Sequence, residues 1–273
     1  MMLDAHETLQ NIDSGHELYG LDADPFHEHW LEIVETYTDA HITKPEDKLV
    51  AISGLAREVH GQTKDLYCAG IWEKDVIRQL LWRAQTPQPF RYKAYRAPSW
   101  SWASVDGKVT FMARTTIESY PELSVSNTRT LGTDSSPWSF GQISYGFIRV
   151  RGALKTTQRC ERRNGAYKLL LTDELDELEN DLQVTYGDFY PNVIPMHLAE
   201  QSICQPVSSY VNSEFATEKE NRGIGFLARL VIVPTGDFQH EYQHIRSFSI
   251  PNPAGRAWFG DWGQQDFQDI IVI

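Results

Sequence analysis

The chain has 273 residues and a formal net charge of −12 at pH 7. Its length suits one large domain or two small ones, and its charge repels the phosphate backbone of a nucleic acid. The three cysteines, Cys68, Cys160 and Cys204, are far apart and form no metal-spaced pair, which is typical of free thiols rather than a disulfide framework. The N-terminal residues have no signal-peptide pattern, and no apolar run approaches the roughly 20 residues of a membrane span. We therefore predict a cytoplasmic protein without a membrane partner.

Helical spacing of apolar residues dominates the sequence before residue 85. A first helix is predicted over 26–37, where four large apolar residues share one face. The run TKPE at 43–46 matches a capping box and predicts the start of a second helix that ends near Gly61. A third helix is predicted over 73–84, because its first turn is acidic and its apolar residues repeat at spacings of four.

Short β-branched segments bounded by Gly, Pro, Asn and Asp replace the helical pattern after residue 95. They predict strands over 100–104, 108–116, 142–152, 167–171, 193–198, 224–233, 242–250 and 267–273, with a loop over 205–222. The series predicts an α+β fold, in which helices of the N-terminal part (1–94) pack on an antiparallel β-sandwich or partly closed β-barrel (95–273), as one compact unit. Five apolar residues from both parts should then be buried together: Leu49, Ile52, Val59, Leu80 and Trp102.

Two runs that match functional motifs fail on their context. HEYQH at 240–244 has the histidine spacing of a zinc-protease helix, but its surroundings alternate as in a strand. In a strand, positions i and i+4 stand about 13 Å apart and cannot share a metal ion. GIGFLA at 223–228 fits a dinucleotide-binding glycine pattern, but the strand-like segment follows the glycines instead of preceding them. We therefore predict neither a metal site nor a cofactor.

Several blocks of the sequence have a distinctive composition: DKLVAISGLARE (47–58), YCAGIWEKDVIRQLLWR (67–83), YRAPSWSWASVDG (95–107), FGQISYGFIRVRGAL (140–154) and the terminal IIVI. Together they resemble the C-terminal companion region of fungal heterokaryon-incompatibility (HET-domain) proteins, from about Trp30 onward. The HET module that precedes these blocks in the family has no counterpart in this sequence, so we expect the chain to lack the signalling role proposed for that module. The resemblance implies no established chemistry for the region that remains.

The tryptophan block YRAPSWSWASVDG is interpreted mainly as scaffold, because blocks shared by proteins with different tasks tend to build a fold. Trp100 and Trp102 are two positions apart and would face the same side of a strand. Asp106-Gly107 is expected to form a turn, and Arg96 can pair with a carboxylate. The alternative is that one face of the tryptophans forms the floor of an apolar pocket.

Three functional hypotheses follow. The first is a cofactor-independent cyclase or isomerase of fungal specialised metabolism, a pericyclase of the Diels–Alder type acting on an apolar polyketide or terpenoid, because pericyclic steps need orientation more than a nucleophile. The alternative is a non-catalytic interaction or regulatory module derived from a heterokaryon-incompatibility protein. A third hypothesis is a hydrolase with an unrecognised His–acid pair. A closed apolar pocket would favour the enzyme, and a flat exposed apolar patch would favour the interaction module.

The chemistry of a cyclase is expected outside the family blocks. His197, in the apolar run VIPMHL, is the candidate catalytic residue, and its alternative role is that of a buried histidine bonded to a backbone carbonyl. The run WFGDW at 258–262 is either a turn of packed aromatic residues or a lid over a cavity. The candidate pocket residues are aromatic: Trp100, Trp102, Trp138, Tyr186, Trp258 and Trp262. The expected partner is an apolar small molecule, and the oligomeric state is not predicted.

Overall fold

The computed structural model describes residues 25–40, 42–85, 94–111, 117–118, 123–132, 140–156, 159–163, 166–170, 203–211, 225–251 and 267–273. Its helices are α2 (Pro25–Asp39), α3 (Lys48–Thr63) and α4 (Val76–Gln79), with 3-10 turns η2 (Pro45–Asp47), η3 (Glu73–Asp75) and η4 (Trp102–Ser104). The strands are β1 (Tyr67–Cys68), β2 (Ile71–Trp72), β3 (Trp82–Ala84), β4 (Val109–Phe111), β5 (Ile117–Glu118), β6 (Leu123–Gly132), β7 (Ile143–Ala153), β8 (Lys155–Thr156), β9 (Arg159–Arg163), β10 (Ala166–Leu170), β11 (Ile203–Val211), β12 (Gly225–Pro234), β13 (Glu241–Pro251) and β14 (Phe267–Val272).

The first two predicted helices are present, but their ends differ from the sequence prediction. The capping box is wrong: residue 44 precedes the 3-10 turn η2 without a side-chain cap, and α3 begins only at Lys48. Helix α3 also continues past Gly61 to Thr63. It ends there because Lys64 adopts the left-handed conformation (φ 57°) and its N–H donates to the carbonyl of His60.

The third predicted helix is much shorter than residues 73–84. It consists of the turn η3 and the single turn α4, after which Trp82–Ala84 forms strand β3 and pairs with β4. The indole N–H of Trp82 donates to the carbonyl of Trp100 at 2.8 Å. A contact with a residue far along the chain therefore accompanies the change from helix to strand, which the local apolar spacing does not reveal.

A large sheet forms the second layer, with strand order β5-β11-β12-β13-β14-β7-β6. Its pairs are antiparallel except β13 with β14, which is parallel. The loop predicted over 205–222 is wrong for residues 205–211, which belong to strand β11, and residues 212–222 lie outside the described residues. Strand β6 was not predicted at all. In the described part of the sheet, β5 and β6 stand at opposite ends of the order and do not pair with each other. The fold is therefore α+β, with strands that are mainly antiparallel; the predicted strand 193–198 lies outside the described residues.

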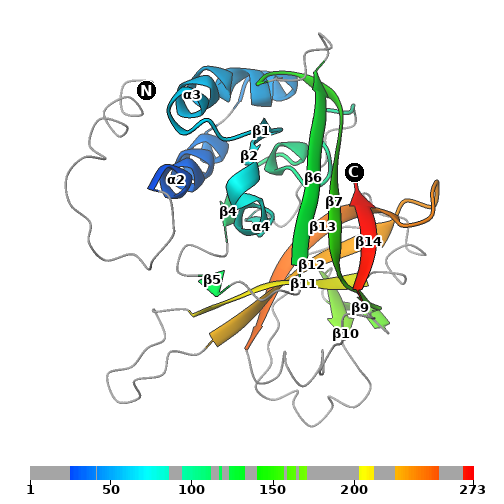
Figure 1. Ribbon diagram of the computed structural model, residues 1–273. Coiled ribbons are helices and arrows are strands. Elements are labelled where there is room, and N and C mark those ends of the chain that lie inside the picture. The colour runs from blue at the N-terminus through cyan, green and yellow to red at the C-terminus, as the bar shows by residue number, and fades with distance from the viewer. Residues whose placement is uncertain are drawn as a thin grey trace.

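One buried cluster contains residues from the helices and from the sheet. Figure 1 shows the helices together on one side of the molecule, with the long strands β6, β7 and β14 on the other. The cluster joins Trp30 of α2 to Ile148 of β7 and Ile270 of β14, all at most 1% exposed. The predicted shared burial is confirmed for the whole predicted set: Leu49, Ile52, Val59, Leu80 and Trp102. None of the helices among the described residues has the length and apolar character needed to cross a membrane.

Candidate functional site

The tryptophan block at 95–107 is not a strand, so the strand predicted over 100–104 is wrong. Residues Trp102–Ser104 form the 3-10 turn η4, and the hydroxyl of Ser101 caps it by accepting the N–H of Ala103 at 3.0 Å. Serine side chains compete with strand pairing through such local bonds to the backbone. Trp100 is nevertheless fully buried, as is Trp102.

Gly70 is the point at which three distant parts of the chain meet. It lies in the turn between β1 and β2, with φ 96°, and Ala69 before it has φ 49°. The carbonyl of Gly70 accepts the indole N–H of Trp30 at 2.9 Å and that of Trp102 at 2.8 Å. A Cβ atom at position 70 would lie 2.5 Å from Nε1 of Trp102, so only glycine allows this close approach.

The serines of the block connect it to the β1–β2 turn and to the end of the sheet. The Ser99 N–H donates to the carbonyl of Ile273 at 3.0 Å, and the Ser99 hydroxyl bonds to the same carbonyl while accepting the N–H of His244 at 2.8 Å. The hydroxyl of Ser101 donates to the carbonyl of Ala69 at 2.5 Å. These hydroxyls are engaged in structural bonds, which supports the scaffold interpretation. A pocket role for the tryptophans stays a prediction.

A buried lysine and a buried arginine hold the end of the same block. Nζ of Lys48 donates to the carbonyl of Val105 at 2.6 Å and lies 5.4 Å from the centre of the Trp102 ring. Burial, together with the nearby Arg96 guanidinium, lowers the pKa of Lys48 to about 7. Arg96 pairs with the carboxylate of Asp106 at 2.7 Å, which confirms the predicted ion pair. Because Lys48 is only 2% exposed, its amine is placed to hold a carbonyl and not to attack a substrate.

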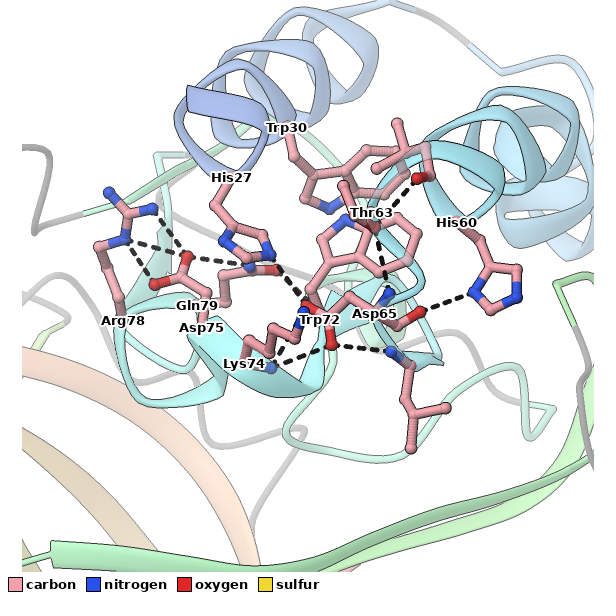
Figure 2. Close-up of polar contacts among 12 residues, drawn as sticks. His27, Trp30, His60, Thr63, Asp65, Trp72, Lys74, Asp75, Arg78 and Gln79 are labelled. Atoms are coloured by element: carbon pink, nitrogen blue, oxygen red, sulfur yellow. Dashed lines mark hydrogen bonds and ion pairs between the residues drawn. The ribbon is translucent and has the colours of Figure 1, made fainter. Parts of the chain in front are cut away.

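Figure 2 shows a second polar cluster, which connects α2 to the segment that follows α3. His27 and Asp65 are 4% and 2% exposed, and the two side chains lie 2.9 Å apart from Nε2 to Oδ2. The Asp65 carboxylate also accepts the N–H of Leu66 at 2.7 Å and the N–H of Lys74 at 3.3 Å. The ring of His60 bonds to the Asp65 carbonyl at 2.7 Å.

This His–Asp pair is the kind of arrangement that a hydrolase would use, but a hydrolase also needs a nucleophile beside the histidine. Across the described residues, no hydroxyl or thiol group is hydrogen-bonded to His27. The thiol of Cys68 follows Asp65 by three positions in the chain, but burial raises its pKa to about 12, so it stays protonated at neutral pH. The bonds of the pair join α2 to the segment that leads into the β1–β2 hairpin. The pair could not be predicted from the sequence, because neither residue belongs to a motif.

Arg78, at the left of Figure 2, makes further ion pairs in this polar cluster. Its guanidinium pairs with Asp75 at 2.8 Å and with Glu28 of α2. The side-chain amide of Gln79 donates to Asp75 at 2.9 Å and accepts the N–H of Trp72 at 3.1 Å. Burial lowers the pKa of Arg78 to about 10, which still leaves the guanidinium charged at neutral pH. The charges of this cluster are therefore used to hold α2 against α4.

The two motif-like runs lie in the conformations that the sequence analysis predicted. His240 lies in a turn with φ 62° and Glu241 begins strand β13, so HEYQH is not a helix. Its second histidine, His244, is buried against the Trp82 ring at 5.2 Å. The run GIGFLA leads into strand β12, which begins at Gly225. Within the described residues, no three metal-ligating side chains gather to hold an ion.

The candidate residues outside the tryptophan block are not placed by the structure. The catalytic candidate and most pocket candidates lie outside the described residues: His197, Trp138, Tyr186, Trp258 and Trp262. The structure therefore brings together only Trp100 and Trp102 of the predicted set, and it brings them into the core.

An exposed apolar surface lies on the β6–β7 hairpin. Leu131 of β6 and Tyr145 of β7 are direct partners across the two strands and are 48% and 45% exposed. The Phe147 ring lies 6.1 Å from that of Tyr145, and Arg129 is its partner on β6. Cross-strand partners share one face of a sheet, so we call Arg129, Leu131, Tyr145, Phe147 and Arg149 the hairpin face. The alternation of threonines with Arg129 and Leu131 was the sequence signal that could have revealed β6.

Comparison of the chain with protein-family models, curated proteins and solved structures finds no match.

Proposed function

We propose that the chain is a non-catalytic interaction module, derived from the companion region of a heterokaryon-incompatibility protein. The observation that carries the proposal is the contiguous exposed apolar surface of Leu131 and Tyr145 on the hairpin face. Single exposed apolar residues are ordinary, whereas adjoining ones on a sheet face form a continuous apolar surface that a partner protein can cover. The buried polar side chains described above support the same conclusion, because their bonds hold the scaffold together.

Site-specific photo-crosslinking tests this proposal. A benzophenone amino acid is introduced at Tyr145 in one variant and at Phe238, which is 73% exposed in a turn, in a matched control variant. We expect position 145 to give a discrete adduct with one protein in the native cell and position 238 to give none. The proposal fails if both positions give the same adducts, or if neither gives any.

A second candidate function is the cofactor-independent cyclase or isomerase, and the aromatic content of the chain, with 8 Trp, 12 Tyr and 12 Phe, supports it. Of the 8 tryptophans, Trp30, Trp72, Trp82, Trp100 and Trp102 are buried in the core. Trp138, Trp258 and Trp262 lie outside the described residues, as do Tyr186 and His197, and they stay the predicted pocket residues. Such a pocket would require the sheet to curve into the sandwich or partly closed barrel that the strand pattern predicts.

Binding of the neutral apolar dye N-phenylnaphthylamine tests this second candidate. Saturable binding that Trp258→Ala weakens and Tyr145→Ala leaves unchanged would support an apolar pocket. Absence of saturable binding would contradict it.

A further inference from the structure

The hairpin face changes from apolar to basic along the strands. Tyr145, Phe147, Arg149 and Arg151 alternate along β7, and successive members of such a set lie about 6.6–6.8 Å apart. The residues between them point to the core, where Ile148 and Val150 are fully buried. On β6, Leu131 stands beside Tyr145 at the apolar end, and Arg129 stands beside Phe147 toward the basic end.

The charge of this part of the sheet is opposite to that of the whole chain. Strands β6, β7 and β14 contain three arginines and one acidic residue, a net charge of +2 (3 − 1), whereas the chain carries −12. The acidic residue is Asp269, which pairs with Arg151 at 3.0 Å, and both side chains are about half exposed. The arginines at 129 and 149 are exposed as well. A local positive field of this kind attracts an anionic partner.

Strand β6 also lies at one end of the sheet order. In the part of the chain that the structure describes, its backbone hydrogen bonds run to β7 and to no other element. A strand edge of this length can accept an extended peptide as an additional strand, whose main chain supplies binding energy and whose alternate side chains supply specificity.

We propose that the β6 edge binds an extended acidic segment of a partner protein. In this segment an apolar side chain lies against Leu131 and Tyr145, and a carboxylate toward the basic end faces Arg129. The proposal rests on the function proposed above and names the class of partner. A long nucleic acid is disfavoured, because the −12 charge of the chain repels it and it has no amide backbone to pair with β6.

Fluorescence anisotropy with synthetic peptides tests the proposal on the full chain. The probe is a labelled peptide of about ten residues with one leucine followed by glutamates at alternate positions, and its control has glutamine in place of each glutamate. We expect the glutamate peptide to bind about fivefold more tightly at low ionic strength, an advantage that high salt removes. Methylation of alternate peptide nitrogens on the pairing edge should abolish binding, because it removes the donors of a strand pair.

Two arginine variants locate the effect. Arg129→Gln should remove most of the preference for glutamate, whereas Arg83→Gln, at an exposed arginine of β3, should leave it unchanged. Equal binding of the two peptides, equal effects of the two variants, or tighter binding of a single-stranded RNA oligomer would each overturn the proposal. The proposal would also be overturned if the wild-type chain self-associates and only Arg129→Gln dissociates it, because a second copy of the chain would then occupy the β6 edge. If these results exclude an acidic peptide while Tyr145 still crosslinks to one protein, the partner class is wrong and the interaction function stands; if the crosslink is also absent, both fail.

Discussion

Truncation of Trp102 is the sharpest test of the scaffold assigned to the tryptophan block. The side chain is fully buried, its N–H donates to Gly70, and its ring meets Tyr37 edge-on with centroids 6.0 Å apart. Replacing a buried tryptophan with alanine costs about 3–5 kcal/mol, the lost hydrogen bond about 1 kcal/mol, and the aromatic pair about 0.5–1 kcal/mol. These contributions overlap, so we expect Trp102→Ala to lower the free energy of unfolding by about 5 kcal/mol. That loss approaches the whole stability of many domains.

Urea unfolding followed by far-ultraviolet circular dichroism measures this loss without depending on tryptophan fluorescence. Trp102→Phe serves as a graded variant, because it keeps most of the apolar burial and should lose about 1–2 kcal/mol. Tyr145→Ala, at a half-exposed aromatic residue, is the matched control and should change stability by less than about 1 kcal/mol. A loss below about 1 kcal/mol for Trp102→Ala would refute the scaffold assignment. A loss for Trp102→Phe as large as that for Trp102→Ala would show that the polar contact, and not packing, dominates.

The remaining predictions concern a turn, a buried amine and a segment outside the described residues. Gly70→Ala should destabilise the fold by more than about 2 kcal/mol in the same urea assay, because the alanine Cβ would press on the Trp102 ring and alanine disfavours a positive φ. An unchanged stability would contradict the close approach of Gly70 to Trp102. The folded chain releases the Lys48 proton near pH 7 and the unfolded chain near 10.5, so stability should rise with pH between these values by about 1.4 kcal/mol per pH unit, and Lys48→Met should remove this slope. Parallel stability curves for the wild type and Lys48→Met between pH 7.5 and 9.5 would show that the amine is not depressed in the folded state. Trp258→Ala should leave the thermal midpoint nearly unchanged if the WFGDW segment covers a pocket, and a fall as large as that of Trp102→Ala would place Trp258 in the core.

Elements with strong local patterns were predictable from the sequence, and elements defined by distant partners were not. The apolar stripe of α2 and the alternation in β7, β12 and β13 are local properties, and each predicted segment matches its element to within one or two residues. The segment Trp82–Ala84 has the spacing of a helix, but it pairs with β4 as a strand. The stretch Trp102–Ser104 was predicted as a strand, yet a serine cap turns it into a 3-10 helix.

The candidate site divides in the same way. The Arg96–Asp106 pair could be anticipated, because the two residues belong to one block and lie only ten positions apart. Burial of Lys48 could not, since its carbonyl acceptor lies 57 positions further along the chain. His27 and Asp65 are likewise 38 positions apart. Contacts of this kind depend on the packing of helices and hairpins, which a single sequence does not encode locally.

The shared carbonyl of Gly70 has a consequence for how the molecule opens. Its two indole donors come from 40 positions earlier and 32 positions later in the chain. Helix α2, the β1–β2 hairpin and the tryptophan block must therefore all be in place before both bonds are protected from water. Separation of either indole would expose the carbonyl and the remaining indole bond together. Helix α2, the β1–β2 hairpin and the tryptophan block should therefore behave as one cooperative opening unit. The indole protons of Trp30 and Trp102 should then exchange with deuterium at one common rate. That rate is set by the opening of the whole unit and not by local fraying of α2 or of the tryptophan block.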